Sequence, residues 1–198
     1  MKESLSDDDY RKYRWFFTSS GKLVVGGKSD SQNELVIENF LKDGYMVMHT
    51  SKPGSGFMVL VSEKWNKKDL EEMAVFCGCF SKQWKLSVKG KKISVDMFEG
   101  SDVFKKKGMK TGTFGVSGKK ENFMVVPELV LVKQKGLLRA VPRWKGMVRK
   151  DYYLGIEVGK TGKGEVVDVL MGRLMKKRVK VSRDEVLSAI PSDRLGIK

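Results

Sequence analysis

The chain is poor in side chains that bind metals: its 198 residues include one histidine, His49, and two cysteines, Cys77 and Cys79. A structural zinc site needs four good ligands, and the cysteines lie in an apolar stretch that predicts a buried helix. We therefore expect no metal and no cofactor. His49 has no nucleophile or carboxylate at a recognisable catalytic spacing, so we expect it to face a binding groove and expect no enzyme activity.

Long apolar runs and a disulfide framework are also absent. No run of about 18 apolar residues occurs, and the opening MKESLSDDDY contains no apolar segment typical of a secretion signal. A Cys-x-Cys pair does not form an ordinary disulfide framework, which indicates a reducing compartment. These features predict a cytoplasmic protein without a membrane partner and without a small-molecule substrate.

A complete phosphate-binding loop is missing as well. GIEVGKT at residues 155–161 has one residue fewer between its first glycine and Gly-Lys than that loop requires. Because the loop has a fixed size, we do not expect nucleotide hydrolysis there.

Acidic residues are scarce relative to basic ones: 39 Lys and Arg against 24 Asp and Glu give a formal net charge of +15. Between Lys133 and Lys150 basic residues occur without a single acid. This excess is greater than solubility requires and predicts an anionic partner, with nucleic acid first. An adaptor that binds acidic protein or ribosomal surfaces remains an alternative, as does an accessory role in RNA modification. DNA also remains open, since charge does not distinguish it from RNA.

The hydrophobic pattern predicts an α+β fold with a mixed or antiparallel sheet, two main helices and a small C-terminal α/β extension. RWFFTS, KLVV, YMVMHT and FMVLVS are typical of strands, and shorter strands are expected between residues 86 and 141. One helix is expected after Ser29, ending near Gly44, and a second after Asn66, with Asp69 at its third position. The extension is expected to contain a strand, an amphipathic helix and a last helix capped by Ser182.

The same pattern divides the chain into three parts. Residues 1–12 are predicted to be a flexible acidic N-terminus, residues 13–146 a binding domain and residues 147–198 the extension. Most aromatic side chains are expected in the core, and Trp144 is expected to be more exposed because it lies in the basic stretch.

Four linked motifs resemble a known family. They are YRWFFTSSGKLVVGGKSDSQNE, a strand that ends in His49 before a PGS loop, CFSKQW, and KTGTFGVSGKKENF. In this order they resemble the NFACT-R RNA-binding module of the ribosome-quality-control NFACT proteins, over about Tyr13 to Val126. The larger members contain further domains without counterparts here, so nascent-chain tailing is not carried over to this chain.

The resemblance implies RNA binding, with tRNA and the large ribosomal subunit as partners. The matching motif positions are Arg14, Trp15, Gly26, Gly27, Lys28, Asp30, Gln32, Asn33, Glu34, His49, Gly54, Ser55, Ser81, Trp84, Gly118, Lys119 and Lys120. Two positions depart from the family pattern: Ser51 stands where an acid is common, and Ser31 where an alanine is common.

The residues themselves suggest how part of this set would work. Gly26 and Gly27 would let the backbone approach a ligand closely, just before a helix N-terminus that favours anions. Gln32, Asn33 and Glu34 would lie on the first turns of that helix and could hydrogen-bond bases or ribose.

Overall fold

A computed structural model describes residues 9–198. Residues 1–8 of the predicted acidic N-terminus lie outside this range. Residues 9–12 are ordered, however: they form the short 3-10 helix η1 (Asp9–Lys12), whose Tyr10 is buried against Trp15 and Phe17. The α+β fold is confirmed, and every strand pairing among the described residues is antiparallel.

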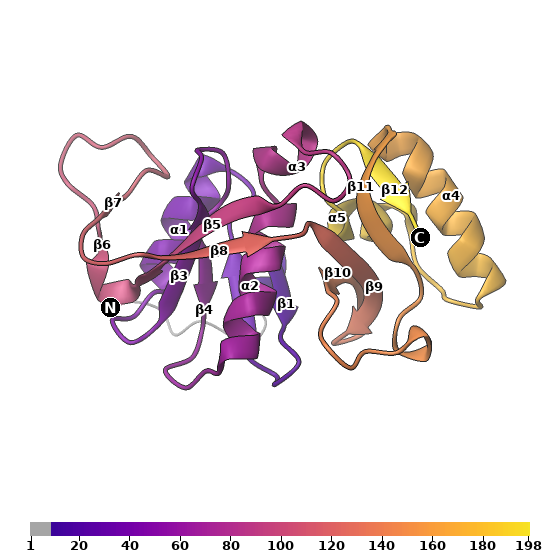
Figure 1. The fold of residues 1–198 in the computed structure, drawn as a ribbon, viewed down its shortest axis with the longest axis horizontal. Coiled ribbons are helices and arrows are strands. Elements are labelled where there is room, and N and C mark those ends of the chain that lie inside the picture. Colours follow the sequence, from indigo (N-terminus) through magenta and orange to yellow (C-terminus); the bar gives the residue numbers. More distant parts are fainter. Residues whose placement is uncertain (1–8) are drawn as a thin grey trace.

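The larger sheet has six strands in the order β1-β2-β4-β3-β5-β8. Their bounds are β1 (Arg14–Phe17), β2 (Leu23–Gly26), β3 (Met46–Thr50), β4 (Met58–Leu60), β5 (Ile93–Glu99) and β8 (Glu121–Val125). Helices α1 (Asp30–Phe40) and α2 (Lys67–Cys79) cover its opposite faces (Figure 1). The alternation of side chains along a strand explains this: Val24 packs in the core on the α2 side, and the next residue, Val25, on the α1 side.

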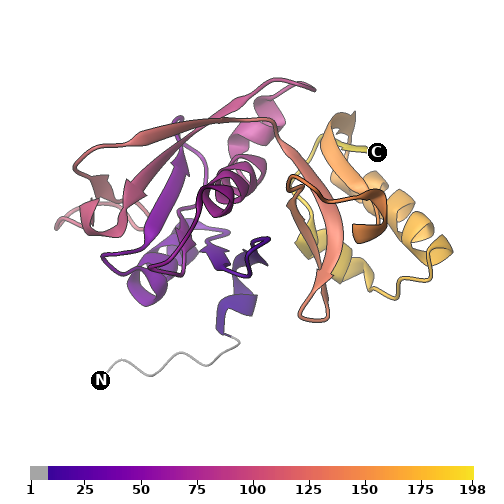
Figure 2. The same ribbon diagram turned by 60° about the horizontal axis from the view of Figure 1, so that its bottom comes forward.

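The smaller sheet has four strands in the order β10-β9-β11-β12. Their bounds are β9 (Glu128–Gln134), β10 (Leu137–Pro142), β11 (Gly155–Thr161) and β12 (Leu195–Ile197). Helices α4 (Lys163–Lys176) and α5 (Arg183–Ala189) pack beside it, as Figures 1 and 2 show. The expected boundary between residues 146 and 147 therefore falls inside one sheet, with two strands before it and two after it.

Helix α2 is buried because it lies between the two sheets. It contacts β3, β5 and β8 of the larger sheet and β9 and β10 of the smaller one. This position explains why the second half of the helix, MAVFCGC at residues 73–79, is apolar almost all round. Both cysteines are buried in it as free thiols. A single apolar cluster runs from Phe16 through α2 to Leu195.

Three predicted helix caps are confirmed. The Ser29 side chain accepts from Gln32 N, the Asn66 side chain accepts from Asp69 N, and the Ser182 side chain accepts from Glu185 N. These residues favour the cap because their short side chains satisfy backbone N–H groups that have no partner inside the helix.

Some predicted boundaries were wrong. Helix α1 ends at Phe40, before a turn in which Tyr45 N donates to Lys42 O. The second helix, which the sequence predicts to continue to Trp84, ends at Cys79, and Ser81 caps a separate helix, α3 (Lys82–Leu86). Between β5 and β8 the chain forms the 3-10 helix η2 (Gly100–Asp102) and a ribbon of β6 (Val103–Phe104) and β7 (Gly115–Val116). The 3-10 helix η3 (Arg149–Asp151) precedes β11.

None of the helices in residues 9–198 is both long and apolar enough to cross a lipid bilayer.

Candidate functional site

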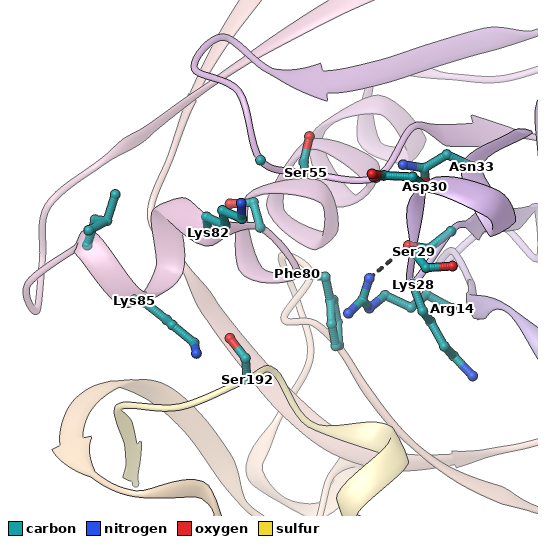
Figure 3. A pocket seen from close by; sticks show the side chains of 15 residues that line it. Arg14, Lys28, Ser29, Asp30, Asn33, Ser55, Phe80, Lys82, Lys85 and Ser192 are labelled. Atoms are coloured by element: carbon teal, nitrogen blue, oxygen red, sulfur yellow. Dashed lines mark hydrogen bonds between the residues drawn. The ribbon is translucent and has the colours of Figure 1, made fainter. Parts of the chain in front are cut away.

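A cavity of about 560 Å³ lies where the start of α1, the loop at residues 54–56 and helix α3 meet (Figure 3). Ser192, from the turn before β12, lines its remaining side. Elements that are far apart in the sequence thus enclose one space.

Two glycines set the shape of the wall near α1. A Cβ atom on Gly27 or on Gly56 would overlap the Asn33 side-chain oxygen, so both positions need glycine. The close approach is therefore to the protein's own Asn33, and no ligand is needed to explain these glycines. Asn33 is only 6% exposed, and its side-chain oxygen has no hydrogen-bond partner among the described residues.

Arg14 is held in place at the base of the cavity. Its Nη1 donates to Gly27 O at 2.7 Å, and its guanidinium lies over the Phe80 ring, 5.4 Å from the centroid. Burial lowers the pKa of Arg14. The side chain is thus a partly desolvated cation with donors still free to bind an anion.

Further cations surround the same space. Lys28, Lys82 and Lys85 line the cavity, and among the described lining residues Asp30 is the only acid. Burial, Arg139 and Arg14 lower the pKa of Lys28, and burial, Arg14 and Lys85 lower that of Lys163. In the part of the chain that the structure describes, none of these cations forms an ion pair with a carboxylate.

The C-terminal part of the chain holds one wall of the cavity. Trp84 Nε1 donates to Asp193 O at 2.9 Å, and Arg194 Nη1 donates to Lys85 O at 2.7 Å. The Asp193 side chain in turn accepts from Lys163 N at 3.0 Å. These bonds fix the Ser192 turn against α3.

The structure brings about half of the predicted site residues together. Those that line the cavity are Arg14, Gly27, Lys28, Asp30, Asn33, Gly54, Ser55 and Ser81. Gly54 has φ 115°, in the left-handed region that favours glycine, and its carbonyl accepts from Lys82 N at 2.7 Å. This contact joins the loop to the start of α3.

Both predicted tryptophans have structural positions. Trp15 is 1% exposed and lies under Arg139, whose guanidinium is 4.6 Å from its ring centroid, and Trp84 is fully buried. Burial lowers the pKa of Arg139 to about 10. Neither indole ring can stack on a base without leaving the core. Trp144 is half-buried and packs against the core cluster.

Three residues around the start of α1 make local contacts outside the cavity. Gly26 lies where a Cβ would overlap the Met58 side chain. Gln32 Oε1 accepts from Lys28 N, which supports the cap of α1. Glu34 accepts from Lys105 Nζ at 2.8 Å and from Gly112 N at 2.7 Å, and these bonds lower its pKa.

His49 also lies outside the cavity. Its ring is half-buried, with Nδ1 2.7 Å from Thr50 O and the ring centroid 4.9 Å from that of Phe57. Burial lowers the pKa of His49, which favours the neutral ring.

Lys119 and Lys120 precede β8, away from the cavity lining. Lys120 Nζ is 3.0 Å from the Asp96 carboxylate, which also accepts from Ser51 and Asn122. Lys120 is thus tied into a network on the sheet. Lys119 is exposed, and Gly118 before it has φ 77°.

Sequence reasoning missed Lys82, Lys85, Lys163 and Ser192. Lys82 and Lys85 flank Trp84 in SKQWKL, and their spacing of three residues on a helix was a signal that could have identified them. Lys163 and Ser192 carry no local signal, because only the packing of the C-terminal part brings Ser192 to the cavity wall and Lys163 near Arg14 and Lys85.

The chain is similar to a known protein family and to several characterised proteins. Residues 12–118 match the model of the NFACT protein RNA binding domain. The ribosome quality control complex subunit NEMF of human and of mouse is 27% identical over 78 residues, which cover 38% of this chain and 7% of those proteins. The ribosome quality control complex subunit 2 of Schizosaccharomyces pombe is 27% identical over 174 residues, covering 82% of this chain and 16% of that protein.

A solved structure has a similar fold. The C-terminal part of the fibronectin/fibrinogen-binding protein from Streptococcus suis matches with a TM-score of 0.52 and 22% identity, covering 64% of this chain and 49% of that one. The chain spans only a small part of the length of the curated relatives that it matches.

Proposed function

The chain belongs to the family of NFACT protein RNA-binding domains, and we propose that it binds structured RNA through the cation-lined cavity at the start of α1. The observation that supports this site is a group of four lining cations that form no ion pair with a carboxylate among the described residues; Arg14 and Lys28 are partly desolvated, and Lys82 and Lys85 are exposed beside them. Like charges held together raise the free energy of the unbound protein, and a polyanion would relieve that repulsion.

The proposed contacts are mainly electrostatic. Lys28, Lys82 and Lys85 would bind phosphates and supply affinity, while Asn33 and Ser55 would add hydrogen bonds to sugar or base. Such an interface provides recognition and positioning, and we propose no reaction for it.

Salt dependence tests the proposal. With about five phosphate contacts, a slope near −0.7 per contact predicts roughly a hundredfold loss of affinity between 50 and 200 mM salt. Fluorescence anisotropy of labelled tRNA at these two concentrations measures it. Undetectable binding, or affinity that does not change with salt, would reject RNA binding by this site.

The names of the curated relatives suggest a cellular context. We propose that the chain contributes RNA contacts in ribosome-associated quality control in the cytoplasm, with tRNA or the large ribosomal subunit as its partner. The RNA-dependent part of this proposal predicts that the full chain co-sediments with large subunits and that nuclease treatment releases it. Co-sedimentation that survives nuclease would instead favour an adaptor that binds proteins.

A further inference from the structure

We propose that the cavity binds a phosphomonoester, such as the terminal phosphate of an RNA strand, in preference to an internal phosphodiester. This inference rests on the proposed RNA-binding function and names the ligand group for the same site. A phosphomonoester occurs at the 5′ end or the 3′ end of an RNA strand and in a free mononucleotide, and the experiment compares these three sources.

The positive charge at the cavity is greater than the charge that one internal phosphate would neutralise. Its described lining has four cations, Arg14, Lys28, Lys82 and Lys85, against the single carboxylate of Asp30. A phosphodiester carries one negative charge, whereas a phosphomonoester carries about 1.5 to 2 at pH 7. The terminal group therefore neutralises more of the unpaired positive charge.

Asn33 provides a second observation that points to a ligand. Its side chain is 6% exposed, and its oxygen has no hydrogen-bond partner among the described residues. Figure 3 shows its amide nitrogen directed toward the side of the cavity where Ser55 lies. A buried amide is costly unless its hydrogen bonds are made. The unpartnered oxygen is an acceptor, which a ribose hydroxyl of the bound nucleotide can satisfy, while the amide nitrogen can donate to a phosphate oxygen.

The start of α1 adds to this donor set. Ser29 and Asp30 line the cavity, and the N-terminus of an 11-residue helix carries a partial positive charge. The Arg14 guanidinium is already oriented by Gly27 O and Phe80, so little side-chain entropy is lost when it binds an anion. Donors from two elements thus converge on one space.

The walls of the cavity also favour a strand end. The loop at residues 54–56 closes one side, and the Ser192 turn, held by Trp84 and Arg194, closes another. An internal phosphate needs room for the chain to enter and to leave, whereas a terminal phosphate needs one opening. Leu86 lines the cavity and is 71% exposed, so it offers an apolar surface to the adjoining nucleoside.

The experiment compares one short single-stranded RNA in three forms, with a 5′-phosphate, with a 3′-phosphate, and with hydroxyl groups at both ends. Anisotropy with the full chain should show about tenfold tighter binding of one phosphorylated form, as expected for one additional charge-assisted contact. The double variant Lys82→Gln/Lys85→Gln should remove this difference. The matched control is Lys176→Gln/Lys177→Gln on the exposed end of α4, which should preserve it.

A thermal-shift measurement with a nucleoside 5′-monophosphate and with a nucleoside 3′-monophosphate tests whether the cavity binds the phosphomonoester when it is not part of an RNA strand. We expect the monophosphate that matches the preferred end to raise the Tm of the wild-type chain and not that of the Lys82→Gln/Lys85→Gln variant. Equal affinity for all three RNA forms would overturn the terminal-phosphate proposal and leave RNA binding standing. Failure of every RNA to bind would overturn both.

Discussion

Lys28 has one favourable contact in the unbound protein, since its Nζ donates to Lys12 O at 2.9 Å, but its charge is in an unfavourable position. Its pKa is lowered by burial, by Arg139 and by Arg14, so the folded state disfavours its charged form. A lysine whose pKa is lowered on folding destabilises the protein below that pKa, and the penalty disappears as pH rises through the unfolded value of about 10.4. At neutral pH the charge therefore serves binding at some expense of stability.

Lys28→Met tests whether this charge favours RNA binding and disfavours folding stability. The variant should change the Tm little, because the lost hydrogen bond to Lys12 O and the removed repulsion from neighbouring cations oppose each other. It should reduce the salt slope of RNA binding by about 0.7. Thermal unfolding and anisotropy at several salt concentrations measure the two effects. The control, Lys176→Met, should leave both unchanged. A lower Tm together with unchanged binding would assign Lys28 a structural role.

Asp69 is a residue whose charge does stabilise the fold. It is fully buried at the start of α2, where it accepts from Thr18 and Ser20 side chains and from Asn66 N. Burial raises its pKa, but these bonds outweigh burial and hold the pKa of Asp69 below its ordinary value. The side chain thereby fastens the turn between β1 and β2 to α2.

Asp69→Asn should lower the free energy of unfolding at pH 7 by about 2 to 3 kcal/mol, because a neutral amide with one acceptor oxygen replaces a carboxylate whose two oxygens accept from Thr18, Ser20 and Asn66 N. The wild-type stabilisation is present above the unfolded pKa of about 3.9 and is lost as pH falls through the lower folded value. Urea unfolding at pH 7 and pH 3 should therefore show a smaller difference between wild type and variant at pH 3. The exposed Glu71→Gln is the control, and equal differences at both pH values would contradict this account.

At the level of elements, α3 connects the two sheets at the cavity. It is short, and Ser81 caps it through Gln83 N. Its Trp84 and Lys85 bind the turn before β12. An isolated helix of this length is not stable in water, so its position depends on these contacts.

Arg194→Asn should loosen this connection without straining the backbone. Arg194 has φ 61°, a conformation that asparagine adopts more readily, and asparagine is too short to reach Lys85 O. We expect a change in stability below about 1 kcal/mol, faster amide hydrogen exchange in residues 82–86 and several-fold weaker RNA binding. Unchanged exchange there would show that the guanidinium bond does not hold α3.

At the level of the whole molecule, the shared position of α2 makes the two sheets one cooperative unit. The apolar cluster continues from the larger sheet through α2 into β9 and β10. Gln134 strengthens this union, since its amide accepts from Phe17 N at 2.9 Å and donates to Phe17 O at 2.7 Å, as a neighbouring strand would.

A single unfolding transition is therefore expected. Calorimetry and circular dichroism should give coincident curves, and a chain truncated after residue 146 should lose cooperative unfolding, because β9 loses its neighbour β11 and β10 loses α5. Two separate transitions in the full chain, or a folded truncated chain, would show that the two parts fold independently.

The sequence alone determined the local features of this protein. Turn residues, alternation and cap residues such as Asn66 and Ser182 specify short segments through interactions within a few residues, so they identified most strands and helix starts. The motif from Arg14 to Asn33 also indicated the side of the cavity formed by β1 and α1. The excess of basic residues identified the class of partner, because net charge needs no fold to be counted.

Only the tertiary structure decided which residues share the cavity. Trp84 and Trp15 match the family motif, but their large apolar surfaces are buried where sheets and helices meet, and this depends on packing between distant segments. His49, Lys119 and Lys120 lie outside the cavity lining for the same reason. The docking of the C-terminal part brings Ser192 to the lining and Lys163 near Arg14 and Lys85. Local sequence cannot encode such long-range contacts by itself, because each depends on the whole chain folding around α2.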